Sequence, residues 1–260
     1  MNTTDNRYSR PDANRSVHPD RGVYFLHRVS TGIKAGARFS LLTHLGTACG
    51  ANVVCAAAAF LLTTLFGGSV YGSDLAGLLL SFVIEWLVAV FIGILEYGRV
   101  CLYMNMQYAQ PVLMQDLFCG FRENTNQIIQ CEAVAAGIRV LLLVPGALAA
   151  LLLPDGMAAR TPLVILLYAA GLCGVIYSRL VFALRYYLLL DYPGSSAADV
   201  LKKSARLMKG NRILLFYIHL SFVPLSALGL LSFGIANLWI TAYRCASDAA
   251  FYRGLMASRQ

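Results

Sequence analysis

Glu85 is the residue of this chain whose surroundings point most directly to chemistry. It stands in the middle of the apolar run 81–90, SFVIEWLVAV. An ionisable side chain inside a membrane-spanning helix is costly and usually functional. We therefore expect Glu85 to carry a proton or to bind a cation. The alternative is a protonated or paired carboxyl that ties helices together, with Arg139 or His219 as its partner.

A second candidate is the basic segment near residue 205. Lys202, Arg206 and Lys209 follow one another at i, i+4 and i+7, so a helix would place them on one face. Such a face could bind a phosphorylated ligand or a cytosolic partner, and the alternative is that it anchors the helix to anionic lipid headgroups. The turn from Met208 to Asn211 either belongs to this binding site or only supplies the left-handed backbone geometry that ends the helix. The candidate set is Lys202, Arg206, Lys209, Gly210, Asn211 and Arg212.

A third candidate is a polar cluster at the end of an apolar helix. Arg179 and Arg185 precede the helix-ending sequence Asp191-Tyr192-Pro193. One interpretation is a plain turn that ends the helix. The alternative is a polar cluster on the cytosolic side, in which Arg179 and Arg185, with Tyr186 and Tyr187, could face Asp191.

Recognisable enzyme motifs are absent from the sequence. It contains no G-x-S-x-G, H-E-x-x-H, Walker or dinucleotide-binding motif. The seven cysteines form no C-x-x-C pair, and the four histidines are scattered. We therefore assign no catalytic residue, metal site or cofactor, and keep a membrane-embedded enzyme only as a third hypothesis.

The composition determines the class of protein. Of the 260 residues, 58% are hydrophobic and 13% are charged, whereas soluble domains carry about 25% charged residues. An ordinary cytosolic enzyme, a disordered protein and a secreted disulfide scaffold are excluded, which leaves a polytopic membrane protein. The net charge of +8 is interpreted as contact with anionic lipid headgroups rather than with nucleic acid.

The elements that must position these residues are apolar helices. We predict an all-α membrane bundle of about six spans, with a disordered cytosolic tail over 1–22 and a single membrane domain over 23–260. An amphipathic helix within 23–45 precedes the spans, and Ser196 and Asp199 form a capping box for a basic surface helix that ends near Met208. The predicted spans are 45–66, 75 to beyond 96, 133–153, 162–190, 213–232 with a kink at Pro224, and 235–251. Residues 112–132 are predicted to form a surface helix and loop.

Basic residues predict the orientation. Seven lie between the N-terminus and Arg38 and seven between Arg179 and Arg212, whereas the loops after the first and third spans hold only Arg160. The positive-inside rule therefore places both termini in the cytosol.

The C-terminal two thirds resemble a known family. The motifs are Asp116-Leu117-Phe118, Val144-Pro145-Gly146, SARLMKGN over 204–211, Leu220-Ser221-Phe222, and a last helix with Leu238-Trp239 and Phe251-Tyr252. Together they resemble the DUF975 integral membrane proteins of bacteria over roughly residues 90 to 256. The link over 147–176 is longer than is usual in that family. The resemblance implies a bacterial cytoplasmic membrane protein and carries no established activity.

Two functions follow as hypotheses. The first is a transport or export component for a lipid-like, peptide or small amphipathic substrate, because Glu85 lies in a span and prolines and glycines interrupt helices. The second is a non-transporting module that binds anionic lipids or partner proteins through its basic cytosolic face. A homo-oligomer or a partner membrane protein is compatible with either.

Overall fold

The computed structural model describes residues 19–67, 75–122, 124–154, 160–231 and 234–257, and helices account for the regular structure within these ranges. Most of the predicted tail lies outside them, and the first helix already begins at Pro19. The elements are α1 (Pro19–Thr43), α2 (Leu45–Gly67), α3 (Leu75–Gln107), η1 (Met114–Phe118), α4 (Cys119–Arg122), α5 (Thr125–Leu152), α6 (Arg160–Val181), α7 (Arg185–Asp191), α8 (Ala197–Leu207), α9 (Arg212–Leu220), α10 (Val223–Leu231) and α11 (Ile235–Ala257).

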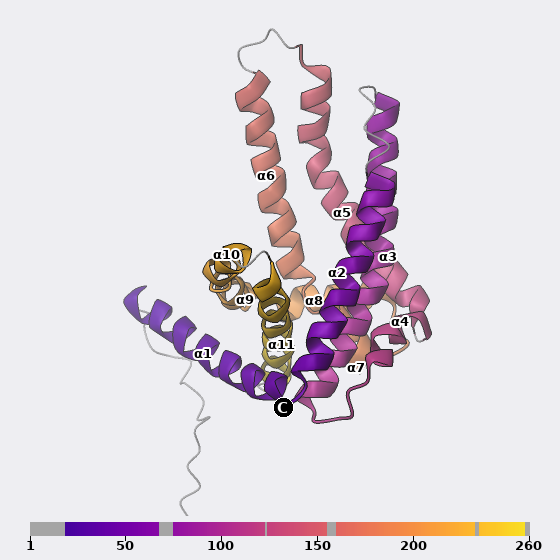
Figure 1. Ribbon diagram of the computed structural model, residues 1–260. Helices are drawn as coiled ribbons and strands as arrows, with labels where there is room; N and C mark the ends of the chain where they lie inside the picture. The colour runs from indigo at the N-terminus through magenta and orange to yellow at the C-terminus, as the bar shows by residue number, and fades with distance from the viewer. Residues whose placement is uncertain (1–18, 68–74, 123, 155–159, 232–233, 258–260) are drawn as a thin grey trace, which may run out of the picture.

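Two helix pairs form the tall part of the molecule. α2 packs on α3, α5 packs on α6, and α3 joins the two pairs through α5. The last turns of α2 and α5 lie at one end of the molecule, whereas α11 ends at the opposite end, beside the start of α2 (Figure 1). The chain therefore returns to the end from which its first long apolar helix departs.

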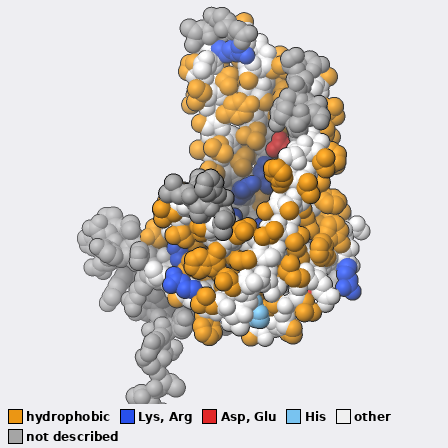
Figure 2. Space-filling view, viewed as in Figure 1, with side chains coloured by type: hydrophobic (Ala, Val, Ile, Leu, Met, Phe, Trp, Pro, Cys, Tyr) orange, Lys and Arg blue, Asp and Glu red, His pale blue; other side chains and the backbone are white. Residues whose placement is uncertain are grey.

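Within the described ranges, five helical segments are long and apolar enough to cross a membrane. They are Leu45–Phe66, Leu75–Gln107, Thr125–Leu152, Arg160–Asp191 and Arg212–Gly229. Large apolar side chains cover their outer faces, as in Phe60, Leu141 and Leu166 (Figure 2), which suits contact with lipid chains rather than with water. The sixth predicted span is a helix, α11, but does not belong to this set, because Arg244, Asp248 and Arg253 interrupt its apolar sequence.

Two predicted spans are broken. The span predicted over 162–190 consists of α6 and α7, with a break at 182–184. The span predicted over 213–232 consists of α9 and α10, with a break at 221–222. Pro224 lies in the first turn of α10 and so starts a helix instead of bending one, because a proline in the first turn has no hydrogen bond to lose.

Other boundaries agree with the predictions. α2 and α8 begin at the predicted residues, and the Ser196 hydroxyl accepts a hydrogen bond from the Asp199 backbone N–H at 3.2 Å. Gly210 has φ +92°, which is the left-handed geometry expected after that helix.

One boundary differs from its prediction. α5 begins at Thr125, earlier than predicted, so that Glu132 belongs to a span and not to a surface loop.

α1 is fastened to the C-terminal helices. The Lys34 ammonium donates to the Ser221 hydroxyl and lies 4.8 Å from the centre of the Phe222 ring. Partial burial lowers the pKa of Lys34 from its ordinary value. The Arg38 guanidinium lies over the Tyr243 ring of α11 at 5.5 Å. Phe39 and Leu42 remain exposed on α1, so the helix has an apolar face toward its surroundings as an interfacial helix does.

The segment after α3 folds back onto that helix. A Cβ atom added at Gly98 would lie 1.8 Å from the backbone oxygen of Leu117, and one added at Gly120 would lie 2.7 Å from the backbone oxygen of Ile94. Leu117 itself is fully buried. The two glycines therefore allow η1 and α4 to rest directly on α3, where other residues would hold them away.

We predict that Gly98→Ala destabilises the protein, because its methyl group would overlap backbone that has no rotamer to change. Overpacking of this kind costs about 1–3 kcal/mol or more. Gly36→Ala is the matched control, since nothing lies within 4 Å of a Cβ at that helical position. Unfolding midpoints of the two variants in one detergent provide the measurement, and equal midpoints would contradict the close contact.

Candidate functional site

Glu132 is the most tightly held charged residue of the described chain. Its side chain is 3% exposed, and three groups donate to its carboxylate. Arg139 Nη2 donates to Oε1. Arg185 Nη2 and the Tyr186 hydroxyl both donate to Oε2, and these two distances are 2.6 Å. A carboxylate buried this deeply has to be paired and hydrogen-bonded to remain charged. Oε2 of Glu132 therefore links α5 to α7, while Oε1 is held by Arg139 of the same helix.

The break at 182–184 places Arg185 between three helices. Because the chain stops being helical there and restarts at Arg185, this side chain leaves the axis of α6 and enters the interior. Its Nη2 atom lies 2.6 Å from Glu132 of α5 and 3.9 Å from Oε2 of Glu96 on α3. Its Nε atom is buried without a hydrogen-bond partner among the described residues. Arg185 thus connects the Glu132 cluster to a second carboxylate.

Glu96 and Arg99 complete the network on α3. They are one helical turn apart, and Arg99 Nη2 lies 3.4 Å from Glu96 Oε1. The charges of Arg139 and Arg179 also act on the Glu96 carboxylate. We call Arg99, Glu96, Arg185, Glu132 and Arg139 the charge network. It holds three cations and two anions, so that it carries one positive charge in excess inside the span region.

Gly93 allows this network to lie against α3. A Cβ atom there would lie 2.5 Å from Glu132 Cγ and 2.8 Å from the Tyr186 hydroxyl oxygen. Any larger residue would displace the carboxylate or the phenol from its partners. A glycine inside an apolar span is therefore used here for close approach of polar side chains.

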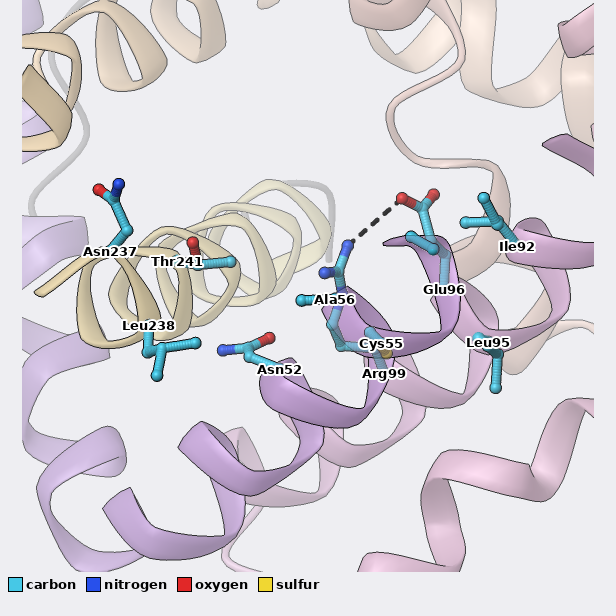
Figure 3. A pocket seen from close by; sticks show the side chains of 11 residues that line it. Asn52, Cys55, Ala56, Ile92, Leu95, Glu96, Arg99, Asn237, Leu238 and Thr241 are labelled. Carbon is cyan, nitrogen blue, oxygen red and sulfur yellow. Dashed lines mark hydrogen bonds and ion pairs between the residues drawn. The ribbon is translucent and has the colours of Figure 1, made fainter. Parts of the chain in front are cut away.

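A pocket opens beside the charge network. It has a volume of about 280 Å³ and lies between α2, α3 and α11. Its walls are mostly aliphatic, and its polar side chains are Asn52, Glu96, Arg99, Asn237 and Thr241. Figure 3 shows Arg99 between Glu96 and the α11 wall, with Asn52 beneath it on α2. Figure 2 shows Lys and Arg side chains inside the hollow between the α6 and α2 sides of the molecule.

Glu85 lies outside this arrangement. Its side chain is exposed on α3, and the described residues provide it with no hydrogen bond or ion pair. The partners considered for it are engaged elsewhere. Arg139 pairs with Glu132, and His219 Nε2 lies 2.8 Å from Asp248 Oδ1. Glu85 is therefore not paired with Arg139 or His219 in the structure, and Glu132 is the carboxylate that ties helices together. A functional role of Glu85 stays a prediction.

The predicted helix-end cluster is divided in the structure. Arg185 turns toward Glu132 and Glu96, and Arg179 is exposed. Asp191 accepts a hydrogen bond from the Tyr252 hydroxyl of α11. The expected meeting of both arginines with Asp191 does not occur, because α7 begins only at Arg185 and turns that side chain toward α5.

The basic candidates lie on α8 and the turn that follows it. Lys202, Arg206, Lys209 and Gly210 are exposed, while Val200, Leu201, Ser204 and Leu207 of the same helix are buried. Asn211 donates to the backbone oxygen of Leu207 at 3.1 Å, which caps the end of α8. Arg212 leaves the exposed set, because its guanidinium donates to the Tyr177 hydroxyl at 2.5 Å and stacks on that ring.

The residues that sequence reasoning missed are Asn52, Arg99 and Glu132, together with a pairing role for Glu96. Local spacing held part of the signal: Glu96 and Arg99 are three residues apart, and Glu132 and Arg139 are seven apart, so each pair shares a helix face. No local spacing predicted the pairing of Arg185 with Glu132 and Glu96, which lie far from it in the sequence. Within the described ranges no group of three His, Cys, Asp or Glu residues is placed to hold a metal ion.

Comparison with known proteins gives one match. The family model described as "Protein of unknown function (DUF975)" aligns with residues 33–259. No curated protein and no solved structure matches the chain.

We predict that Glu132→Gln strongly destabilises the protein, because two arginines would lose the charge that compensates them in a buried site. Breaking a buried pair by removal of one partner costs about 3–5 kcal/mol. Arg122→Gln on α4 is the control, because Arg122 is exposed and lies outside the spans and the charge network; such a substitution changes stability by about 0.5 kcal/mol or less. Unfolding midpoints in the same detergent measure both, and a Glu132→Gln midpoint equal to that of the control would refute the pairing.

Proposed function

Because the chain belongs to the DUF975 family of proteins of unknown function, we propose its function from its own site. It is a membrane transport or export component that takes a lipid-like amphiphile into the pocket between α2, α3 and α11. This proposal narrows the substrate classes that the sequence left open and moves the site from Glu85 to the charge network.

The observation that carries the proposal is the excess of arginine beside an open pocket. Ionisable residues in membrane spans usually line substrate pathways or relays. The charge network holds one more cation than anions, and the carboxylates alone therefore leave one positive charge uncompensated. Here Arg99 faces the pocket with a 21% exposed side chain, while its partner Glu96 also interacts with Arg185. The network is therefore suited to receive a further polar group.

The helix breaks support a pathway. Irregular backbone at membrane depth is tolerated where it is buried in protein or lines a cavity, and transporters place substrate sites at such breaks. The break at 182–184 directs Arg185 into the network. The break at 221–222 lies beside α1 and α11, where Lys34 contacts Ser221.

We place the protein in the bacterial cytoplasmic membrane with both termini in the cytosol. Seven basic residues up to Arg38 and seven from Arg179 to Arg212 support this orientation. The arrangement in Figure 1 is consistent with it, because α11 ends at the end of the molecule where α2 begins.

We predict that the protein accelerates the movement of tail-labelled phospholipids across a bilayer. Fluorescent phosphatidylglycerol and phosphatidylcholine in proteoliposomes are bleached from outside with dithionite, and the protected fraction reports transbilayer movement. Arg99→Gln should reduce the rate to that of protein-free vesicles, because it removes the cation of the pocket. Arg122→Gln, an exposed substitution on α4 outside the network, should retain the rate. A wild-type rate equal to that of protein-free vesicles for both lipids would reject transport of lipid-like substrates.

A second function, the non-transporting module, is favoured by the surface of α8. The helix exposes Lys202 and Arg206 and buries Val200, Leu201 and Leu207, and Lys209 follows on the exposed side. We call Lys202, Arg206 and Lys209 the basic surface. Such a surface attracts anionic headgroups with about 1 kcal/mol per basic residue, and a partner membrane protein with an acidic face is the alternative ligand.

We predict that charge reversal of the basic surface reduces the number of anionic lipids that remain bound to the protein. The variant Lys202→Glu, Arg206→Glu, Lys209→Glu replaces attraction by repulsion without touching buried residues of α8. Native mass spectrometry from nanodiscs of phosphatidylglycerol and phosphatidylcholine counts the retained lipids. Arg122→Glu is the control for a charge reversal at an exposed position outside the basic surface. Unchanged retention in the triple variant would reject this surface as a lipid site.

A further inference from the structure

Asn52 has a hydrogen-bond acceptor for which the described residues provide no partner. The side chain belongs to α2, lines the pocket and is 3% exposed. Its Nδ2 atom donates to the Tyr103 hydroxyl of α3 at 2.9 Å. Its Oδ1 atom is buried, and no donor in the described part of the chain reaches it. Most buried polar atoms have a partner, so each exception calls for an explanation.

Arg99 has donors to spare at the same pocket. Its recorded hydrogen bond within the described ranges is the 3.4 Å contact of Nη2 with Glu96. A guanidinium carries five N–H groups in a planar fork that suits carboxylate and phosphate oxygens. In Figure 3 the Arg99 side chain lies between Glu96 and the α11 residues of the pocket wall. Several N–H groups of Arg99 are therefore free to bind an anion in the pocket.

The sign of the ligand charge follows from Glu96. Its carboxylate is compensated by Arg99 and by Arg185 at 3.9 Å, and Arg139 and Arg179 add positive potential. The local excess of positive charge opposes a cation and favours an anion. The unpartnered Asn52 Oδ1 is a hydrogen-bond acceptor, so the same ligand should also carry a hydrogen-bond donor, such as a hydroxyl group.

Pocket size and depth limit the ligand further. A volume of about 280 Å³ is at the lower end for small-molecule sites, so the pocket holds a headgroup and not a whole lipid. Asn52 is seven residues from the start of α2, and Arg99 is eight from the end of α3. At a rise of 1.5 Å per residue both lie about 10–12 Å from that end of the spans. A headgroup at this depth leaves its acyl chains level with the apolar outer faces.

We propose that the pocket binds the headgroup of an anionic lipid that also carries a hydroxyl group, as a glycerol phosphodiester does. The anionic oxygens accept hydrogen bonds from Arg99, and the hydroxyl donates to Asn52 Oδ1. The inference rests on the proposed function, because it names the chemical class of its substrate. The shared chemistry, a hydroxyl-bearing organophosphate, also occurs in soluble molecules, which the experiment includes.

The test is a lipid competition with the intact protein. Nanodiscs contain equal amounts of phosphatidylglycerol, phosphatidylethanol and phosphatidylcholine with identical acyl chains, and native mass spectrometry measures which lipid remains bound. Phosphatidylglycerol and phosphatidylethanol have the same charge and differ in the hydroxyl groups. We expect phosphatidylglycerol to exceed phosphatidylethanol severalfold, and phosphatidylethanol to exceed phosphatidylcholine roughly tenfold, the value of one charge-assisted hydrogen bond.

Two variants assign the preferences to atoms. Asn52→Leu should abolish the preference for phosphatidylglycerol over phosphatidylethanol and keep the preference for anionic lipid. Arg99→Gln should abolish the preference for anionic lipid. Arg122→Gln should change neither, and unfolding midpoints verify that each variant is folded. The wild-type comparison needs no variant, so it tests the proposal even where Asn52→Leu fails to fold.

Three outcomes would overturn the inference. In the first, wild-type protein retains phosphatidylglycerol and phosphatidylethanol equally. In the second, both preferences persist in folded Asn52→Leu and Arg99→Gln, which would assign the lipid to another surface such as the basic surface. In the third, soluble glycerol phosphate displaces the lipid, which would assign the pocket to a soluble ligand. If the protein binds phosphatidylglycerol selectively but does not translocate lipids in vesicles, transport is rejected and this inference stands. If it translocates lipids without this selectivity, transport stands and this inference is rejected.

Discussion

A carboxylate that is 3% exposed within a span has to be paired, and Glu132 is paired from both oxygens. Arg139 lies on its own helix, whereas Arg185 and Tyr186 come from α7. The distance between α5 and α7 is thereby limited to the reach of these side chains and the 2.6 Å hydrogen bonds that join them. The Glu132 cluster also packs closely on α3 at Gly93, because Glu132 and the Tyr186 hydroxyl occupy the space that a side chain at Gly93 would fill. The positions of three helices thus depend on one buried anion.

That anion leaves the rest of the network unbalanced. Glu132 compensates Arg139 and part of the charge of Arg185, and Glu96 must serve both Arg185 and Arg99. Unpaired positive charge is costly in a low-dielectric region. The cost is reduced where Arg99 reaches the pocket, because a ligand or solvent can approach it there. The buried Glu132 cluster and the pocket therefore lie at the two ends of one charge network.

Structural and binding roles are separated along the network. The Glu132 end is enclosed, with partners on both carboxylate oxygens, and serves stability. The Arg99 end opens between α2, α3 and α11, where Asn52 keeps an unused acceptor. The basic surface of α8 lies apart from both and faces outward. The proposed lipid contact at α8 and the proposed ligand binding at Arg99 can consequently be tested separately by substitution.

The sequence alone determined the class of protein, most helix boundaries, the family resemblance and the Ser196 N-cap of α8, because hydropathy and caps depend on residues that are neighbours along the chain. It also placed Glu85 within the apolar helix α3, where a functional role stays a prediction. Only the tertiary structure decided that Glu132 is the buried carboxylate and that Arg99 and Asn52 share a pocket. Those relations depend on distances between helices, which are set by the break at 182–184 and by the close approach at Gly93, and neither distance is encoded in local spacing.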